Sequence, residues 1–423
     1  MVPARTPTPA HEDRRVTGVA TAPPSLPPAP RRSRLRVALY SHDTQGLGHI
    51  RRNLAIADAL SRSGDPDVLL LSGAAEARAF ALPPRTDAVT LPALSKDAAG
   101  RYRARRLSAS LHEVVELRAR TIDATLDVFA PDVLIVDKVA RGALGELEPV
   151  LTRLRATGRT KVVLGLRDVL DERATARREW RETRTNEALR CWYDAIWVYG
   201  DPRVADHPSG YGLAPDLASL VRHTGYLVPA GSDWSHPPLR SRPYVLCCVG
   251  GGQDGAPLAE AFLAADPPEG HDAVVVTGPY FPAAARRRLR AQTEGAANRI
   301  VVGAIDDSRP VIAGAAAVVA MGGYNTTVEL LAARRRTLVV PRVTPRQEQK
   351  VRAERLAALG LVHVCDPAAL QPERLSTWLR TAITSEPPTP DDVLDLGGLQ
   401  RLPALLADLV GVSDQNRSRR AAS

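Results

Sequence analysis

Four short segments of the sequence combine glycine, histidine, amide and acidic residues in patterns that suit phosphate and sugar chemistry. The first is TQGLGH (44–49), in which Gly46 and Gly48 directly precede His49. The glycines allow a tight turn and a close approach of the backbone to a ligand, and a neutral histidine is able to remove a proton from a hydroxyl group. We therefore predict His49 as a general base; a histidine that only stabilises the turn is the structural alternative.

The second segment, VGGGQDGAPL (249–258), is a glycine-rich turn between a predicted strand and a predicted helix. Free N–H groups at a helix N-terminus attract phosphate, so this loop is a candidate diphosphate site, although it lacks the Lys-Ser/Thr ending of a P-loop. A tight packing turn is the alternative. The residues predicted to contact the ligand are Gly250, Gly251, Gly252, Gln253 and Gly255.

The third segment, GGYNTTVELL (322–331), is predicted to begin a helix, with Asn325 and Thr326 among its capping residues. Glu329 lies four residues after Asn325, which places it one turn further along the same helix face. If Gly323 and the N-terminus of this helix bind a diphosphate, the attached ribose would lie within reach of Glu329, which would accept hydrogen bonds from its hydroxyl groups. An ordinary cap beside a solvated glutamate is the alternative.

The fourth segment, TPRQEQKVRA (344–353), carries Glu348 and Gln349 in the first turn of another predicted helix. Proline is favourable at such a helix start, and the carboxylate and amide groups that follow it suit the hydroxyl groups of a sugar. A polar, exposed turn is the alternative. All four segments come directly after a predicted strand, so the elements that position them follow from the rest of the pattern.

Short apolar stretches alternate with amphipathic ones along most of the chain. Apolar strands that alternate with helices indicate parallel sheets covered on both faces, and such sheets bind ligands at the carboxyl ends of their strands. The predicted strands lie at 34–41, 67–72, 131–137, 161–168 and 194–201, and then at 244–252, 272–278, 299–304, 315–323 and 336–342.

The alternation breaks at 225–243, a segment with four prolines that we interpret as a linker. The fold class predicted is therefore α/β, with two Rossmann-like, doubly wound domains facing a cleft, one at 34–224 and the other at 244–412. Residues 1–33 and 413–423 have no hydrophobic period and are predicted to be disordered tails.

Charge and composition exclude several classes of protein. The formal net charge is +9, but the first 36 residues contribute +5 and the last 11 contribute +2, so the body carries only +2. A nearly neutral body is a poor match for a surface that follows a phosphate backbone, and no specific nucleic-acid partner is expected. One basic segment, KDAAGRYRARRL (96–107), is a candidate contact for an anionic acceptor or an acidic membrane surface; a solvated basic loop explains it equally well.

The sequence also bears on location and metals. The N-terminus has no apolar region of a secretory signal, no stretch is long and apolar enough to span a bilayer, and the four cysteines include no C-x-x-C pair. We therefore expect a cytoplasmic protein that is able to touch the inner face of the membrane. No D-x-D-like metal motif lies near the four segments.

Together, the four segments resemble the MurG-type glycosyltransferases of the GT-B fold, a family that joins N-acetylglucosamine to a lipid-linked precursor. That family has a glycine-rich loop ending in histidine, like TQGLGH, and a G-G-S-Q-G-A loop, like GGGQDGA. It also has an S-R-x-G-A-x-T-x-x-E stretch, like AMGGYNTTVE, and a D-Q-x-x-N-A helix start, like EQKVRA. The similarity is closer still to an uncharacterised branch known as predicted glycosyltransferases, and it spans roughly residues 34–410.

The resemblance implies a metal-independent, inverting transfer of a hexose or N-acetylhexosamine from a nucleotide sugar, expected to carry UDP. The acceptor is unknown, either lipid-linked or a small molecule, and no cofactor beyond the nucleotide sugar is expected. Two positions depart from the family pattern, since Gly252 replaces a serine and Arg352 replaces an asparagine. Both departures leave the identity of the transferred sugar undecided. The implied residues are the base His49; Gly46, Gly48, Arg101 and Arg103 for the acceptor; the loop Gly250 to Gly255 for the diphosphate; Ile305 for the nucleotide base; Glu329 for the ribose; and Glu348 and Gln349 for the sugar.

Two other functions stay open at this point. A sugar-nucleotide hydrolase or epimerase on the same fold would turn over the donor with no acceptor present. A noncatalytic binding protein that uses the cleft or the basic tails would bind a ligand without turnover.

Overall fold

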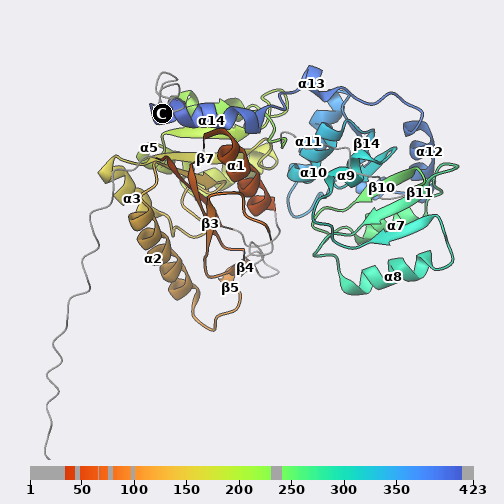
Figure 1. The fold of residues 1–423 in the computed structure, drawn as a ribbon, viewed down its shortest axis with the longest axis horizontal. Helices are drawn as coiled ribbons and strands as arrows, with labels where there is room; N and C mark the ends of the chain where they lie inside the picture. Colours follow the sequence, from red (N-terminus) through yellow and green to blue (C-terminus); the bar gives the residue numbers. More distant parts are fainter. Residues whose placement is uncertain are drawn as a thin grey trace, which may run out of the picture. The chain divides into compact units, whose positions relative to one another are not determined.

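The structure is a computed structural model that describes residues 34–42, 48–64, 66–74, 80–96, 101–229 and 241–411. Both predicted tails, Gly46 and the greater part of the predicted linker lie outside these residues. The described residues belong to one compact unit, and they contain two parallel sheets (Figure 1).

The first sheet has seven parallel strands. The strands β6 and β8 are buried along their whole length, as expected for apolar strands covered by helices on both faces. In spatial order the strands are β3 (Thr86–Thr90), β2 (Asp67–Ser72), β1 (Arg36–Ser41), β6 (Val133–Asp137), β7 (Lys161–Arg167), β8 (Ala195–Tyr199) and β9 (Val221–His223).

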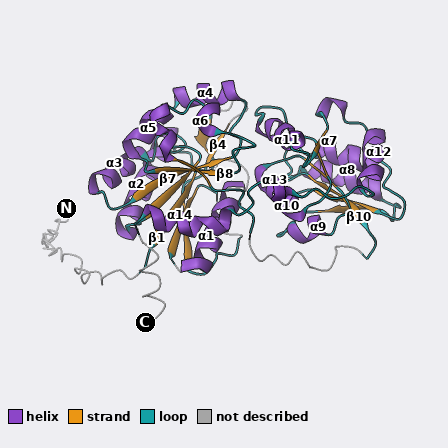
Figure 2. Cartoon of the chain, turned by 90° about the horizontal axis from the view of Figure 1, so that it is seen from above, coloured by secondary structure: helices purple, strands orange, loops and turns teal. Residues whose placement is uncertain are grey.

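Helices cover this first sheet, as Figure 2 shows. The longest of them begins with a capping box in which Ser110 and Glu113 satisfy each other's backbone N–H groups. An antiparallel pair, β4 (Leu94–Lys96) and β5 (Tyr102–Ala104), stands apart from the sheet. The helices are α1 (Gly48–Gly64), α2 (Leu111–Phe129), α3 (Glu148–Thr157), α4 (Arg173–Glu182), α5 (Thr185–Trp192), α6 (His207–Gly210) and the 3-10 helix η2 (Pro215–Leu220).

The second sheet has six parallel strands and is built in the same way. In spatial order the strands are β12 (Arg299–Val302), β11 (Asp272–Val276), β10 (Tyr244–Cys248), β13 (Val318–Ala320), β14 (Thr337–Val339) and β15 (His363–Val364). Its helical elements are α7 (Ala256–Ala264), α8 (Ala283–Thr293), α9 (Arg309–Ala313), α10 (Tyr324–Ala333), α11 (Glu348–Ala358), η3 (Pro367–Ala369), α12 (Pro372–Ala382) and α13 (Pro390–Val393).

Both sheets reverse their winding at one point, and the glycine-rich segments lie there. In the first sheet β1 pairs with β2 on one side and with β6 on the other. In the second, β10 pairs with β11 and with β13. The carboxyl ends of the strands on either side of such a reversal leave a crevice that binds ligands. The predicted α/β fold with two doubly wound halves is thus confirmed.

The last helix, α14 (Gly398–Leu409), leaves the second half and packs on the first. It lies beside α1 (Figure 1), and Leu402 and Leu406 share an apolar core with Ile56 and Leu60. The pattern of apolar residues in α14 faces this core, because Leu399, Leu402 and Leu406 are the buried positions. The predicted second domain, 244–412, includes α14 by sequence, but α14 packs on the first half.

Buried polar contacts join the two halves. The guanidinium of Arg352 on α11 donates to both carboxylate oxygens of Asp168, at 2.7 and 2.8 Å, just after β7. The Tyr226 hydroxyl donates to the same carboxylate at 2.9 Å, and the Tyr324 hydroxyl donates to the Tyr199 carbonyl at 2.9 Å. All of these groups are buried, so the halves meet through a packed interface at these points.

Candidate functional site

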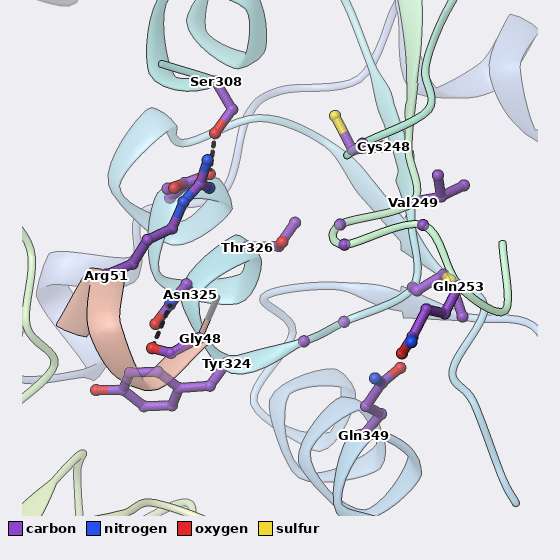
Figure 3. Close-up of a pocket in the computed structure, with 18 of the residues that line it drawn as sticks. Gly48, Arg51, Cys248, Val249, Gln253, Ser308, Tyr324, Asn325, Thr326 and Gln349 are labelled. Atoms are coloured by element: carbon purple, nitrogen blue, oxygen red, sulfur yellow. Dashed lines mark hydrogen bonds between the residues drawn. The ribbon is translucent and has the colours of Figure 1, made fainter. Parts of the chain in front are cut away.

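A cavity of about 320 Å³ lies where the loops of the two switch points meet (Figure 3). This volume is at the lower end of the range for small-molecule sites. The first half contributes mainly the start of α1, and the second half contributes the loops after β10 and β13 and the start of α11. The predicted residues that line it are Gly48, His49, Gly250, Gly251, Gly252, Gln253, Ile305, Gly323, Asn325, Thr326, Glu329, Glu348 and Gln349.

The remaining predicted residues do not line this cavity. Gly255 is the N-cap of α7, where an added Cβ would overlap the Val249 side chain, so its role is tight packing. Arg101 and Arg103 are exposed beside and on β5. Gly46 lies outside the described residues. The acceptor roles predicted for Arg101, Arg103 and Gly46 stay predictions.

His49 is held by a carboxylate that comes from the neighbouring strand. Its Nδ1 lies 2.8 Å from Oδ2 of Asp137, the last residue of β6. The His49 side chain is 18% exposed and that of Asp137 is 3% exposed, so the imidazole borders the cavity while the carboxylate lies behind it. Because a carboxylate only accepts hydrogen bonds, Nδ1 carries the proton and Nε2 keeps a free lone pair.

Arg52, one turn along α1, completes this arrangement. Its Nη2 donates to the same Oδ2 of Asp137 and lies 3.0 Å from Nδ1 of His49. Burial alone would raise the pKa of Asp137, but the charges and hydrogen bonds of Arg52 and His49 lower it well below its usual range. Asp137 is therefore ionised at neutral pH, and its carboxylate fixes the imidazole tautomer that a general base needs.

The loop after β10 has a geometry that explains why residue 252 is glycine. Gly252 is buried with φ of +93°, and an added Cβ would overlap the carbonyl oxygen of Thr277. A serine, which the related family carries at this position, would meet the same obstacle. The missing hydroxyl group is therefore a consequence of how this loop packs on the segment after β11.

Alanine at Gly252 is expected to destabilise the protein by about 2–4 kcal/mol, because it combines a left-handed backbone with a steric overlap. The matched control is Gly270→Ala, since Gly270 has φ of +75° and nothing within 4 Å of an added Cβ; it should cost only about 1–2 kcal/mol. Urea unfolding of both variants measures the difference. Equal losses would show that the overlap is relieved without cost.

Helix α10 presents an uncapped N-terminus to the cavity. Its N-cap is Gly323, which has no side chain to accept from the first N–H groups, so the prediction that Asn325 and Thr326 cap this helix is wrong. Both residues already lie inside the first turn. The Asn325 amide instead donates to the Gly48 carbonyl of the other half at 3.1 Å (Figure 3). The orphan N–H groups and the helix dipole make this end attractive to an anion.

Glu329 lies one turn deeper in α10 and faces the same cavity. The Ser308 hydroxyl donates to its Oε2 at 2.7 Å. Burial raises the pKa of Glu329 above its ordinary value, and this outweighs the lowering by the Ser308 hydrogen bond and by the charge of Arg51. The carboxylate is thus positioned within the cavity but is easier to protonate than an exposed one.

The start of α11 presents two further polar side chains. Glu348 accepts from Nη2 of Arg342 at 2.8 Å, while its Oε2 is buried and has no partner among the described residues. The Gln349 Oε1 accepts from the Arg342 backbone N–H at 3.1 Å, and its side chain points toward that of Gln253 (Figure 3). Glu348 and Gln349 thus keep polar capacity for a ligand with hydroxyl groups.

Sequence reasoning missed the charged residues that the first half brings to the site. Asp137 and Arg167 end neighbouring strands, β6 and β7, so the rule that ligands lie at carboxyl ends of strands could have identified them. Arg51 and Arg52 lie two and three residues after the predicted base His49. Arg342 and Ser308 carried no signal of their own, because they depend on how the loops of the second half fold back.

The described residues contain no group of three or more His, Cys, Asp or Glu side chains arranged to hold a metal ion. Among the helices described, none is both long and apolar enough to cross a membrane.

Comparison with known proteins identifies the architecture. No protein-family model and no curated protein sequence matches the chain. In structure it is similar to MurG of Acinetobacter baumannii, with 16% sequence identity, a TM-score of 0.55, and coverage of 88% of this chain and 99% of that one. It is similar to LpCGTa in complex with UDP, with 16% identity, a TM-score of 0.57, and coverage of 90% and 99%.

A third similar structure is the glycosyltransferase VinC in complex with dTDP, with 17% identity, a TM-score of 0.53, and coverage of 90% of this chain and 100% of that one. In each case nearly the whole of the other chain is covered. These identities are too low to transfer an activity, but the match in architecture extends over both halves. The chain has the GT-B fold of these glycosyltransferases.

Proposed function

We propose that this protein is a glycosyltransferase that moves a hexose or N-acetylhexosamine from a nucleotide sugar to an acceptor hydroxyl group. The observation that carries the proposal is the meeting, in one cavity, of His49 backed by Asp137 with a glycine loop and an uncapped helix N-terminus. The UDP and dTDP found with the two similar proteins support a pyrimidine nucleoside diphosphate as the carrier. We favour UDP.

In this proposal the donor diphosphate binds at Gly250–Gly252 and at the start of α10. Glu329 accepts from the ribose, Ile305 lies by the nucleotide base, and Glu348 and Gln349 hold the sugar. These residues all line the cavity. The N–H groups at the helix start stabilise the negative charge that grows on the departing diphosphate.

The chemical step follows from the His49 tautomer. Nε2 of His49 takes the proton of the acceptor hydroxyl, whose oxygen attacks the anomeric carbon of the sugar. The bond from that carbon to the diphosphate oxygen breaks, and the nucleoside diphosphate leaves with the electron pair. Attack from the face opposite to the leaving group inverts the anomeric configuration. Asp137 stabilises the imidazolium that forms.

The test combines a binding screen with a transfer assay. Thermal shifts with the common nucleoside diphosphates and sugar nucleotides identify the carrier, because a ligand that binds only the folded state raises its stability. Mass spectrometry then follows glycosylated products across acceptor pools. A control without acceptor separates transfer from hydrolysis or epimerisation of the donor. Binding of no nucleotide would overturn the proposal, and turnover without acceptor would replace it by one of those reactions.

The raised pKa of Glu329 gives the donor site a pH dependence. As pH falls through that pKa, Glu329 becomes protonated and loses its charged acceptor, so donor affinity should fall at a higher pH than an exposed glutamate would titrate. Glu329→Gln should bind the donor about tenfold to a hundredfold more weakly at neutral pH and show a flat profile. Titration calorimetry with UDP-glucose measures both, since its diphosphate stays ionised over this range. An unchanged profile in Glu329→Gln would remove Glu329 from the donor site.

A further inference from the structure

The first half lines the cavity with a cation that has no acidic partner in the part of the chain that the structure describes. Arg167 ends β7 and borders the cavity. Among the described residues no carboxylate lies within ion-pair distance of its guanidinium, and its Nε is buried without a hydrogen-bond partner. A half-buried cation whose Nε is cut off from water is costly unless a ligand supplies a partner.

A second cation stands on the adjacent strand end. Lys138 follows β6, is half-buried, and makes no ion pair with any described residue. Burial and the positive charge of Arg167 lower the pKa of Lys138 to about 8, and burial with the charges of Arg352 and Arg52 lowers the pKa of Arg167 to about 10. Each of the two groups therefore lies in an environment that disfavours its charge.

The acidic residues nearby are already engaged with other arginines. Asp137 pairs with Arg52, and Asp168 pairs with Arg352 at 2.7 Å. Asp171 and Glu179 pair with Arg346 at 3.1 and 2.7 Å, and Glu348 pairs with Arg342 at 2.8 Å. If Asp137 or Asp168 turned toward Arg167, Arg52 or Arg352 would lose its carboxylate.

Arg167 and Glu348 both line the cavity, one from each half. Burial alone would raise the pKa of Glu348, but the charges of Arg167, Arg342 and Arg352 lower it, so Arg167 is electrostatically close. The two side chains nevertheless form no ion pair, and neither Oε2 of Glu348 nor Nε of Arg167 has a hydrogen-bond partner among the residues that the structure describes. An unmatched donor and an unmatched acceptor thus border one cavity.

We propose that Arg167 binds a carboxylate or phosphate group on the substrate that lies between His49 and Glu348. The inference rests on the proposed function, which assigns the donor diphosphate to the second half and leaves Arg167 for a further anion. A planar guanidinium binds such groups through two parallel hydrogen bonds. The anion belongs either to the transferred sugar, as in a hexuronate, or to the acceptor.

The experiment compares matched ligands that differ in this charge. UDP-glucose and UDP-glucuronate differ only at C6, and titration calorimetry gives their affinities for the full chain. For an anion on the acceptor, inorganic phosphate is titrated into protein saturated with UDP. If the binding screen identifies another nucleotide, the glucose and glucuronate derivatives of that nucleotide replace UDP-glucose and UDP-glucuronate. The variants are Arg167→Gln and Arg167→Lys, and the control is Arg288→Gln, an exposed arginine that pairs with Glu260 on α7.

We expect either UDP-glucuronate or phosphate to bind the unaltered protein at least about tenfold more tightly than it binds Arg167→Gln. The affinity for UDP should be the same in both proteins. Arg167→Lys should restore part of the lost affinity for the anionic ligand, and Arg288→Gln should leave that affinity unchanged. Preference for UDP-glucuronate assigns the anion to the sugar, and Arg167-dependent phosphate binding assigns it to the acceptor. UDP binding with neither effect overturns this inference alone, whereas failure of every nucleotide to bind overturns the proposed function and the inference with it.

Discussion

Alanine in place of His49 is expected to lower kcat for transfer by about 10²–10⁴-fold, the usual contribution of a general base. The reason is that no other described side chain combines an accepting nitrogen with a place at the cavity edge beside the donor loop. Donor affinity should change little, because His49 acts on the acceptor and not on the nucleotide. Steady-state kinetics for transfer and calorimetry for nucleotide binding separate the two effects.

Asp137→Asn tests the same arrangement without altering its size. An asparagine is able to donate to Nδ1, which moves the proton to Nε2 and removes the lone pair that accepts the hydroxyl proton. We expect kcat to fall by at least about tenfold, and stability to fall as well, because Arg52 stays buried without its carboxylate. His112→Ala is the control, since His112 is an exposed histidine on α2. Full transfer activity in His49→Ala would remove His49 from the mechanism. A loss of transfer activity in His112→Ala would show that the assay responds to protein stability and not to the catalytic step.

Much of the site was predictable because its residues follow buried strands. The glycine loops after β1, β10 and β13 stand out in the sequence by composition, and parallel sheets place such loops at one edge. What the sequence could not supply was the order of the strands. Asp137 lies 88 residues from His49 in the chain, and the two meet because β6 pairs on one side with β1, which is distant in the sequence, and on the other with β7.

Other differences come from long-range packing that local patterns do not encode. Tyr226 lies in the segment predicted as a linker, yet it is fully buried and bonded to Asp168. Helix α14 carries an ordinary amphipathic pattern, which indicates that it buries one face but not that the face belongs to α1. The short strands β9 and β15 have too few residues to show a period of their own.

Arg352 gives the second large effect that we expect. Replacement by methionine leaves the Asp168 carboxylate buried without its cation, and such a loss costs about 3–5 kcal/mol of unfolding free energy. The exposed pair of Arg288 and Glu260 serves as the comparison, since its loss should cost less than about 1 kcal/mol. Urea unfolding, with the midpoint and slope both fitted, measures these values.

The double variant Arg352→Met, Asp168→Leu separates two roles for Arg352. The related family carries an asparagine at this position in its helix-start motif, which would suggest a contact with the sugar. Here the guanidinium instead spans from α11 to Asp168 and to the Gly322 carbonyl, at 3.2 Å, in the buried interface. If Arg352 only joins the halves, the double variant regains most of the lost stability, because an apolar pair replaces an ion pair without an unmatched charge, and donor affinity stays near its original value. If Arg352 binds the sugar, donor affinity falls in the single and the double variant alike. An interface role for Arg352 thus requires that the double variant regain most of the lost stability and also show the donor affinity of the unaltered protein.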